Sequence, residues 1–299
     1  MMYHTPALLN ESIEGLNILP DGIYVDVTFG GGGHSRGILD RLATGRLLAL
    51  DHDADALANA PDDKRLIVER GNFRFLRNYL AHHGYRHVNG ILADLGVSSH
   101  HLDATERGFS FRYDDAPLDM RMNGAAQLTA KAVVNQYPED SLKCIFAEYG
   151  EISDPGRLAR QIVAVRQKAP INSSGQLIEA IKQSIPRGAE NKYLAKLFQA
   201  LRIEVNSELE SLKSLLSQSV NLLRQGGRLV IITYHSLEDR LVKNFFKNGM
   251  FEGIAEKDIY GNTNVPFRPV NNKAIVPSSE ELTHNNRARS AKLRIGERN

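Results

Sequence analysis

Four consecutive glycines, Gly30–Gly33, directly follow a strand-like run at residues 23–29 and constrain this chain more than any other feature. Glycine has no side chain, so such a run suits a place where the backbone closely approaches another group, usually a ligand. A hydrophobic strand that breaks into a glycine loop and then enters a helix is how open α/β sheets form a cofactor crevice. The alternative is a flexible surface loop, which the strongly patterned flanks disfavour.

The first third of the chain alternates β-rich runs with helical stretches. We expect strands at residues 23–28, 46–50, 65–69 and 88–93, and helices at residues 35–42, 53–60 and 73–82. This spacing predicts a parallel sheet with right-handed crossovers. Helical periodicity then dominates from about residue 106 to 205, and strand character resumes at residues 229–233.

The predicted fold class is therefore α/β, a Rossmann-like sheet interrupted by an all-helical insertion. Residues 1–105 and 207–299 would form one discontinuous domain, and residues 106–206 the inserted helical subdomain. Ser207 to Glu210 reads as a capping box that starts a helix ending near Arg224. Residues 262–279, which are rich in Asn, Pro and Val, read as a loop or an irregular hairpin.

Three residues at the ends of the predicted strands indicate what the glycine loop binds, because ligands of such sheets lie at the carboxyl edge. Asp51 could accept hydrogen bonds from two ribose hydroxyls, Phe73 could cover one face of an adenine, and Asp94 ends the fourth strand. Singly, a strand-final Asp often only caps a helix, and Phe73 would be a core residue. Together they favour an adenosine-type cofactor.

The glycine loop lacks the features of the common phosphate-binding loops. Arg36 and Ser35 occupy the positions where a dinucleotide fingerprint needs its third glycine, in either register, and the chain has no G-x-x-x-x-G-K-[ST] loop. A glycine loop with a downstream acid and no pyrophosphate grip fits S-adenosylmethionine.

Several longer blocks carry a family resemblance that spans essentially the whole chain. They are Asp26 to Ser35 (DVTFGGGGHS), Asp94 to Ser99 (DLGVSS), Glu106 to Phe111 (ERGFSF), Pro117 to Met122 (PLDMRM), Phe198 to Asn206 (FQALRIEVN), Tyr234 to Arg240 (YHSLEDR) and Arg289 to Arg294 (RSAKLR). With these blocks the chain resembles the MraW-like family of bacterial small-subunit ribosomal RNA (cytosine-N4)-methyltransferases.

The resemblance implies a class I methyltransferase sheet that uses S-adenosylmethionine. The implied activity is methyl transfer to the exocyclic N4 amine of a cytidine in small-subunit (16S) ribosomal RNA, near the decoding centre. The residues that would contact the cofactor are Gly32, Gly33, His34, Asp51, Phe73, Asp94 and His101. The chain departs from the family pattern at Val27, where glycine is usual, and at His101, where glutamine is common.

Two residues are candidates for a catalytic role. Asp94 could accept a hydrogen bond from the exocyclic amine, whose lone pair is otherwise delocalised into the ring, or it could serve only the cofactor. His235 follows the fifth predicted strand and could contact the target base. The alternative for His235 is a turn residue, with Ser236 capping the next helix.

Two basic regions are candidates for RNA contact, since the target base must leave its stack to react. The helical insertion, with Arg107, Arg112 and Arg121 near its start, would form an RNA-recognition surface. From His284 onward, five Arg or Lys residues face one acid, a local charge of five minus one, and Arg289, Lys292 and Arg294 are its candidate phosphate contacts. A solvated charged face is the alternative.

Net charge, cysteine content and the lengths of the apolar runs limit which partners, metal sites and cell compartments fit this chain. A net charge of +2 permits a nucleic-acid partner without requiring one. The single cysteine, Cys144, excludes an intrachain disulfide and a Cys-rich zinc site, and we expect no metal. The chain shows no signal peptide and no membrane-spanning apolar run, so we expect a cytoplasmic protein that acts on ribosomal RNA or the small subunit.

Some alternatives stay open at the level of sequence. A homodimer is compatible with the chain but not indicated by it. Two rival functions are a methyltransferase with a small-molecule or protein substrate, and a non-catalytic RNA-binding module with a relic cofactor loop. The intact Gly30–Gly33 loop, Asp51 and Asp94 argue against such decay.

Overall fold

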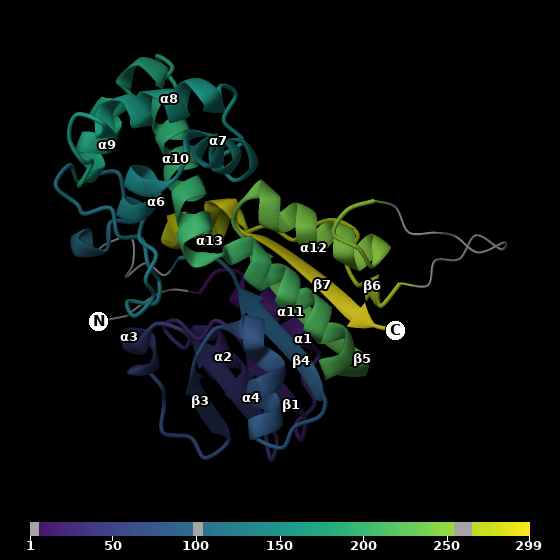
Figure 1. Ribbon diagram of the computed structural model, residues 1–299. Helices are drawn as coiled ribbons and strands as arrows, with labels where there is room; N and C mark the ends of the chain where they lie inside the picture. The colour runs from purple at the N-terminus through teal and green to yellow at the C-terminus, as the bar shows by residue number, and fades with distance from the viewer. Residues whose placement is uncertain (1–5, 98–103, 254–264) are drawn as a thin grey trace. The chain divides into compact units, whose positions relative to one another are not determined.

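The computed structural model describes residues 6–97, 104–253 and 265–299, and the chain divides into two compact units (Figure 1). The sheet unit comprises residues 1–96 and 209–299, and the helical unit comprises residues 97–208. The sequence pattern placed the boundaries at 105/106 and 206/207. The first lies earlier because Val97, the first residue of the helical unit, already packs against the core of that unit.

The sheet unit is built on one seven-stranded sheet. Its strands are β1 (Ile23–Asp26), β2 (Arg46–Asp51), β3 (Leu66–Arg70), β4 (Val88–Asp94), β5 (Leu223–Thr233), β6 (Phe267–Pro269) and β7 (Lys292–Arg298). The strand order is β3-β2-β1-β4-β5-β7-β6; β1 to β5 run parallel, and β7 is antiparallel to both neighbours. The predicted Rossmann-like α/β sheet is confirmed. Chain order reverses between β1 and β4, the switch point where such sheets bind ligands.

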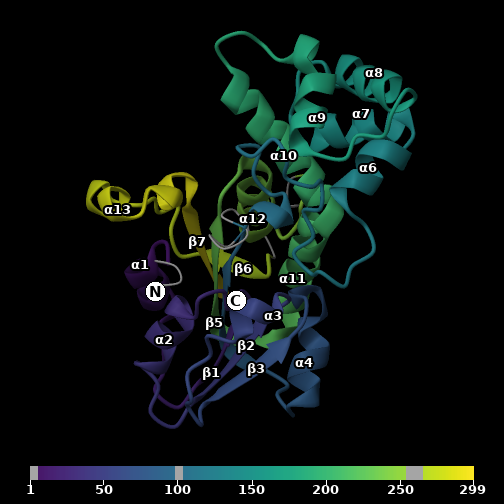
Figure 2. The ribbon, with the colours of Figure 1, turned by 90° about the vertical axis from the view of Figure 1, so that its left-hand side faces the viewer.

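Helices cover both faces of the sheet. They are α1 (Leu9–Leu16), α2 (Gly33–Leu39), α3 (Ala54–Leu57), η1 (Phe73–Phe75), α4 (Leu76–His82), α11 (Glu208–Leu222), α12 (Ser236–Asn248), α13 (Ser279–His284) and η4 (Asn286–Ser290). Successive strand residues point to opposite faces, so Tyr24 joins the apolar core under α1 and α2, whereas Val25 joins the core under α4, α11 and α12. Figure 2 shows α1 and α2 on one side of the sheet and α4 on the other.

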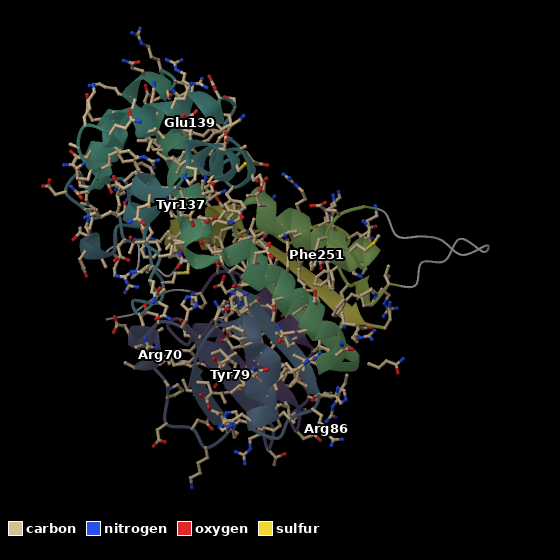
Figure 3. The ribbon with its side chains drawn as sticks, viewed as in Figure 1. Arg70, Tyr79, Arg86, Tyr137, Glu139 and Phe251 are labelled. Atoms are coloured by element: carbon tan, nitrogen blue, oxygen red, sulfur yellow. The ribbon has the colours of Figure 1, made fainter. Side chains whose placement is uncertain are left out.

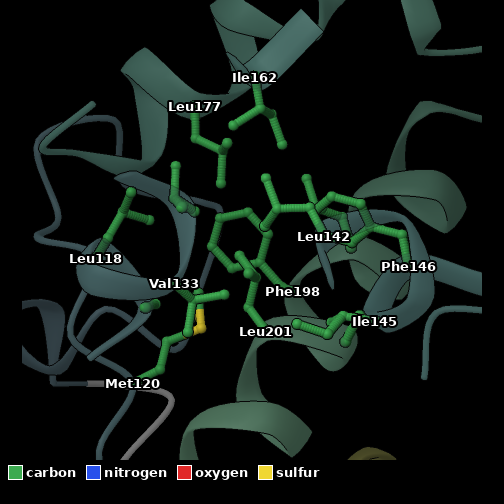
Figure 4. Close-up of a cluster of buried hydrophobic side chains, with 14 of the residues drawn as sticks. Leu118, Met120, Val133, Leu142, Ile145, Phe146, Ile162, Leu177, Phe198 and Leu201 are labelled. Atoms are coloured by element: carbon green, nitrogen blue, oxygen red, sulfur yellow. The ribbon is translucent and has the colours of Figure 1, made fainter. Parts of the chain in front are cut away.

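The helical unit has a core of its own. Its elements are η2 (Thr105–Arg107), α6 (Ala130–Gln136), α7 (Glu139–Glu148), α8 (Pro155–Arg166), α9 (Ser174–Ala180), η3 (Lys182–Ser184) and α10 (Glu190–Asn206). Leu142 and Phe146 of α7, Ile162 of α8, and Phe198 and Leu201 of α10 are buried together (Figure 4). Apolar residues three or four apart on each helix supply this core, and the predicted helical character is confirmed.

The local predictions around the second unit boundary were partly wrong. Ser207 ends α10 in the left-handed region, with φ 49°, rather than forming a capping box. The next helix stops at Leu222, and β5 begins at Leu223 instead of near residue 229. The pairing of β5 with β4 is irregular there, because its register shifts between Val88 and Gly90. An extended but irregular segment of this kind leaves no alternating pattern in the sequence.

The C-terminal basic run forms a strand that the sequence analysis did not predict. Residues 292–298 make β7, which pairs with both β5 and β6. In the described part of residues 262–279, expected to be a loop or an irregular hairpin, β6 and Ile275 both pair with β7 rather than with each other, so the segment is a short edge strand followed by an irregular loop. Across the part of the chain that the structure describes, no helix is long and apolar enough to cross a membrane.

Candidate active site at the carboxyl edge of the sheet

The glycine loop turns sharply between β1 and α2. Gly30 has φ +52° and Gly32 has φ +75°, a region that side chains of L-residues rarely adopt. A Cβ on Gly32 would lie 2.8 Å from the Phe29 ring, and one on Gly33 would lie 2.7 Å from Cγ of Pro6. A Cβ on Gly30 would meet nothing closer than 3.9 Å. The group that the glycine backbone closely approaches is thus, at Gly32 and Gly33, another part of the protein. Beside Gly30 the loop has free space.

Asp51 at the end of β2 holds the glycine loop. Its Oδ2 accepts a 2.8 Å hydrogen bond from the Gly30 N–H, and its Oδ1 accepts one of 2.9 Å from the Asp53 N–H. An ionised carboxylate offers about four acceptor positions, so each oxygen keeps one for another donor. The side chain is half-buried. The predicted ribose-binding acid therefore lies beside the loop, at the edge where it was expected.

Asp94 at the end of β4 is held by two hydroxyl groups. Its backbone N–H donates to Thr28 Oγ1 at 2.7 Å, and its Oδ1 accepts a 2.8 Å hydrogen bond from the Tyr234 hydroxyl. Burial raises the pKa of Asp94 to about 7, helped by the nearby charges of Asp26 and Glu238, while the Tyr234 hydrogen bond acts in the opposite direction. Asp94 can therefore exchange a proton near neutral pH.

A second buried acid lies on the neighbouring strand. Asp26 at the end of β1 is fully buried; its Oδ2 accepts from Ser35 Oγ at 2.7 Å and its Oδ1 from the Thr28 N–H at 3.1 Å. Burial raises its pKa to about 6, against the effect of both hydrogen bonds. Asp26 thus ties the end of β1 to α2 across the glycine loop.

His34, the first side chain after the glycines, is buried and lies between the N-terminal segment and Asp94. Its Nε2 lies 3.1 Å from the Ala7 carbonyl oxygen, which can only accept, so Nε2 carries the proton. Its Nδ1 lies 3.8 Å from Asp94 Oδ2, an ion-pair distance when the ring is protonated. The structure therefore brings two of the predicted cofactor contacts, His34 and Asp94, beside each other.

His235 follows β5 and takes the N-cap position of α12, where the sequence analysis had placed Ser236. Its side chain is 8% exposed, and neither ring nitrogen has a hydrogen-bond partner among the described residues. Nε2 lies 3.2 Å from Glu238 Oε1 without hydrogen-bond geometry, while Glu238 Oε2 accepts from the Tyr234 N–H at 2.9 Å. A buried imidazole left in this state has donor and acceptor capacity for another group.

Two further predicted cofactor contacts have different outcomes. Phe73 begins η1 and packs in the core under α4 and α11, with Leu50, Leu76 and Leu212, and is 9% exposed. Phe73 is therefore mainly a core residue, which is the alternative that its sequence position left open. His101 lies outside the described residues.

The predicted RNA-contacting cations are mostly engaged within their own units. Arg294 donates from Nε to Asp239 Oδ1 at 2.6 Å, and Lys292 Nζ lies 3.4 Å from Asp239 Oδ2, whereas Arg289 is exposed. In the helical unit, Arg107 donates to the carbonyls of residues 121 and 122, and Arg121 forms an ion pair with Asp119. Arg112 is exposed.

Sequence reasoning missed Tyr234, Thr28 and Asp26 as parts of this site. Tyr234 is the polar residue that follows the apolar run of β5, and Asp26 is the acid that precedes the glycine loop. Each therefore carried the strand-end signal used for Asp51 and Asp94. The assembled site holds two raised-pKa carboxyls and two histidines at one sheet edge, an arrangement suited to accepting protons from a polar ligand.

Comparisons with known proteins agree along the whole chain. A family model described as the MraW methylase family matches residues 1–299. A protein of Cytophaga hutchinsonii named Ribosomal RNA small subunit methyltransferase H is 58% identical in an alignment of 299 positions that covers 99% of this chain and 100% of that protein. A protein of the same name from Bacteroides thetaiotaomicron is 56% identical over 100% of this chain and 98% of its own length.

Solved structures are more distant. The crystal structure of an rRNA methylase from Streptococcus thermophilus has a TM-score of 0.44 at 10% identity, and the match covers 99% of this chain and 98% of that one. The alignments with the two curated relatives, by contrast, span both units, and more than half of all aligned residues are identical.

Proposed function

The chain belongs to the MraW methylase family, and from this premise we propose that it transfers a methyl group from S-adenosylmethionine to the N4 amine of a cytidine in small-subunit ribosomal RNA. The observation that carries the proposal is the 58% identity, over its full length, to a protein named Ribosomal RNA small subunit methyltransferase H. The chain is accordingly an enzyme, and the resemblance seen in its sequence motifs is confirmed.

The residues at the carboxyl edge fit S-adenosylmethionine in their donor and acceptor chemistry. Asp51 keeps acceptor capacity on both carboxylate oxygens, which suits the two hydroxyls of a ribose. Asp94 and His34 present an oxygen and a nitrogen 3.8 Å apart, which suits an ammonium group. The loop has space beside Gly30, and its Gly32 and Gly33 would lie along the amino-acid end. Phe73 would offer its exposed edge to the adenine.

When bound, S-adenosylmethionine supplies an electrophilic methyl group on a sulfonium. The cytosine amine would form the new N–C bond while the bond between the methyl group and sulfur breaks and leaves a neutral thioether, and the amine would lose one proton overall. Asp94, whose pKa is raised to about 7 by burial, is matched to accept a hydrogen bond from that amine near neutral pH. The Tyr234 hydroxyl fixes one oxygen of the carboxyl group and leaves the other available. Asp94 therefore serves as the proposed acceptor, next to its role toward the cofactor.

His235 is the proposed contact for the target base. Its buried ring has no hydrogen-bond partner among the described residues, and it follows β5 on the same sheet edge as Asp94. A cytosine that has left its stack presents a donor and acceptors along its Watson–Crick edge. Arg112 of the helical unit and Arg289 of the sheet unit, both exposed, are proposed phosphate contacts. We also propose that the enzyme acts in the cytoplasm.

The test is mass spectrometry of small-subunit ribosomal RNA incubated with the protein and isotope-labelled S-adenosylmethionine. The expected product is labelled N4-methylcytidine at one position. Asp51→Ala is the inactive reference, and boiled protein controls for carry-over. Label on another base, or on a small molecule or protein but not on RNA, would contradict the proposed substrate. Absence of any cofactor binding by the purified chain would contradict the enzyme itself.

A further inference from the structure

The connection between β3 and α4 presents cations and an aromatic ring to solvent. We call Arg70, Arg74, Phe75 and Arg77 the η1 patch. All three arginines are exposed, and Phe75 is 50% exposed, unusual for a ring of this size. The Arg74 Cζ lies 5.3 Å from the centroid of the Phe75 ring, so the guanidinium supports the ring and still leaves half of its surface open.

Within the described part of the chain, no acidic side chain neutralises the charge of the η1 patch. Residues 70–93 contain no Asp or Glu, and no acid forms an ion pair with its three arginines among the described residues. The nearest acid in sequence, Glu69, is paired with His83 at 2.8 Å. This differs from the C-terminal basic run, where Asp239 engages Lys292 and Arg294.

The backbone that carries the η1 patch is fixed by α11. The Arg74 carbonyl accepts hydrogen bonds from Ser214 Oγ at 3.0 Å and from Gln218 Nε2 at 2.9 Å, and Gln218 Oε1 accepts one from the Arg77 N–H at 2.9 Å. Asn72 caps η1 by accepting from the Arg74 N–H at 2.9 Å. The backbone is therefore held in place, while the charged side chains and the ring remain available to a partner.

We propose that the η1 patch binds single-stranded RNA, with Arg74 and Arg77 on phosphates and Phe75 stacked on one base. The inference rests on the proposed function and names the surface of the sheet unit that holds its RNA substrate. Cations interleaved with an exposed aromatic ring are what a single strand requires, because every base has a face to stack and every linkage a charge. Arg70 ends β3 opposite Asp51, the last residue of β2, so the η1 patch begins at the carboxyl edge of the sheet, the edge at which β4 ends in Asp94.

The test measures equilibrium binding of a small-subunit ribosomal RNA transcript between about 50 and 200 mM salt, the range over which phosphate contacts change affinity most visibly. The first variant is Arg74→Glu with Arg77→Glu, and the second is Phe75→Ala. The matched control is Arg86→Glu with Arg224→Glu, which changes net charge equally at exposed arginines near the starts of β4 and β5, the opposite sheet edge. Figure 3 labels Arg70 and Arg86 at different ends of the sheet unit.

The charge reversal should weaken RNA binding about 10- to 100-fold at low salt and lower the log–log salt slope by about 1.4, because two single-strand phosphate contacts are lost. Phe75→Ala should weaken binding about 5- to 100-fold and leave the slope unchanged. All variants should bind S-adenosylmethionine like the wild type, which shows that they fold. Equal weakening by the Arg86/Arg224 control would overturn the assignment, since general charge would then explain the effect.

Further outcomes separate this proposal from the proposed function. If the wild type methylates the RNA and the η1 variants do so with an unchanged KM, only the η1 patch is contradicted. If the variants bind naked RNA normally but fail on assembled small subunits, the partner is a ribosomal protein and the RNA assignment is overturned. If the wild type neither binds nor methylates the RNA, the proposed function fails, and the assignment of the η1 patch fails with it.

Discussion

The Tyr234 hydroxyl donates a 2.8 Å hydrogen bond to Asp94 Oδ1 and links the ends of β5 and β4, although the two residues are 140 positions apart in sequence. Hydrogen bonding to an ionised carboxylate favours its charged form, so Tyr234 opposes the rise in pKa that burial imposes on Asp94. Tyr234 is thus a positioning residue that acts through Asp94.

Tyr234→Phe removes this donor without changing the ring. We expect the pKa of Asp94 to rise further, by about one unit, because a hydrogen bond to a charged group contributes about 1.5–3 kcal/mol. The midpoint of the acidic limb of kcat against pH should move upward by the same amount, with full rates recovered at high pH. Tyr137→Phe is the control, since it removes a 2.9 Å hydroxyl–carboxylate bond to Glu204 within the helical unit. An unshifted pH profile would exclude this role for Tyr234.

Asp94→Asn should separate stability from activity. The pKa of Asp94 is about 7 in the folded chain and near 3.8 when unfolded, so its stabilising contribution is complete below pH 4 and is lost as pH rises to 7. The amide does not ionise, so the free energy of unfolding of the variant should exceed that of the wild type by about 4 kcal/mol at pH 8 and should not exceed it at pH 4. Methylation should fall at least 100-fold. Chemical denaturation at both pH values measures the first effect, and loss of stability at pH 8 would contradict it.

The first four strands and the glycine loop were predictable because their signals are local. Apolar runs of strand length alternate with helical stretches, and Asp51 and Asp94 stand where each run ends. In β7 the same alternation was present, with Leu293 and Ile295 between charged residues, but the arginines and lysine were interpreted as a nucleic-acid surface. The strand was missed because the interpretation followed the positive charges of this run and not the alternating positions of its apolar residues.

The site was predictable residue by residue but not as a network. The bond from Tyr234 to Asp94 joins segments far apart in sequence, and no local pattern records such a partner. The same holds for Arg294, whose Asp239 partner lies 55 residues away. The first bond depends on the register of β5 against β4, and the second on where α12, which carries Asp239, packs beside β7.

Asp51→Ala should weaken cofactor binding strongly while the fold persists. The two hydrogen bonds that we propose between ribose hydroxyls and this carboxylate would be lost, and the Gly30 N–H loses its acceptor. We expect the Kd for S-adenosylmethionine to rise at least about 100-fold, since each such bond contributes about 1.5–3 kcal/mol. Calorimetric titration measures the change. Asp40→Ala, at the exposed end of α2, is the control. An unchanged Kd would remove Asp51 from the site.

Gly32→Ala tests whether the glycine loop is constrained by packing as well as by backbone conformation. Gly32 has φ +75° and would place a Cβ 2.8 Å from the Phe29 ring; Gly84 has φ +76° and nothing within 4 Å. Both substitutions carry the left-handed backbone penalty of about 1 kcal/mol, and only Gly32→Ala adds a clash. Denaturant unfolding should therefore show a loss larger by at least about 1 kcal/mol for Gly32→Ala. Equal losses would mean that Phe29 moves aside freely.

Arg294→Gln should lower stability through its pair with Asp239 rather than through RNA. Nε and Nη2 of Arg294 donate to the two oxygens of this carboxylate at 2.6 and 3.3 Å, and both side chains are largely buried. Removing one partner leaves the other charge uncompensated, so we expect a loss of about 1–3 kcal/mol in the free energy of unfolding. The loss should shrink in an Asp239→Asn background, as a double-mutant cycle would measure.

Arg289→Gln, at an exposed position, should leave stability within about 0.5 kcal/mol and weaken RNA binding instead. Additive losses at residues 294 and 239 would show that the pair contributes nothing, and Arg294 would then return to the candidate phosphate contacts.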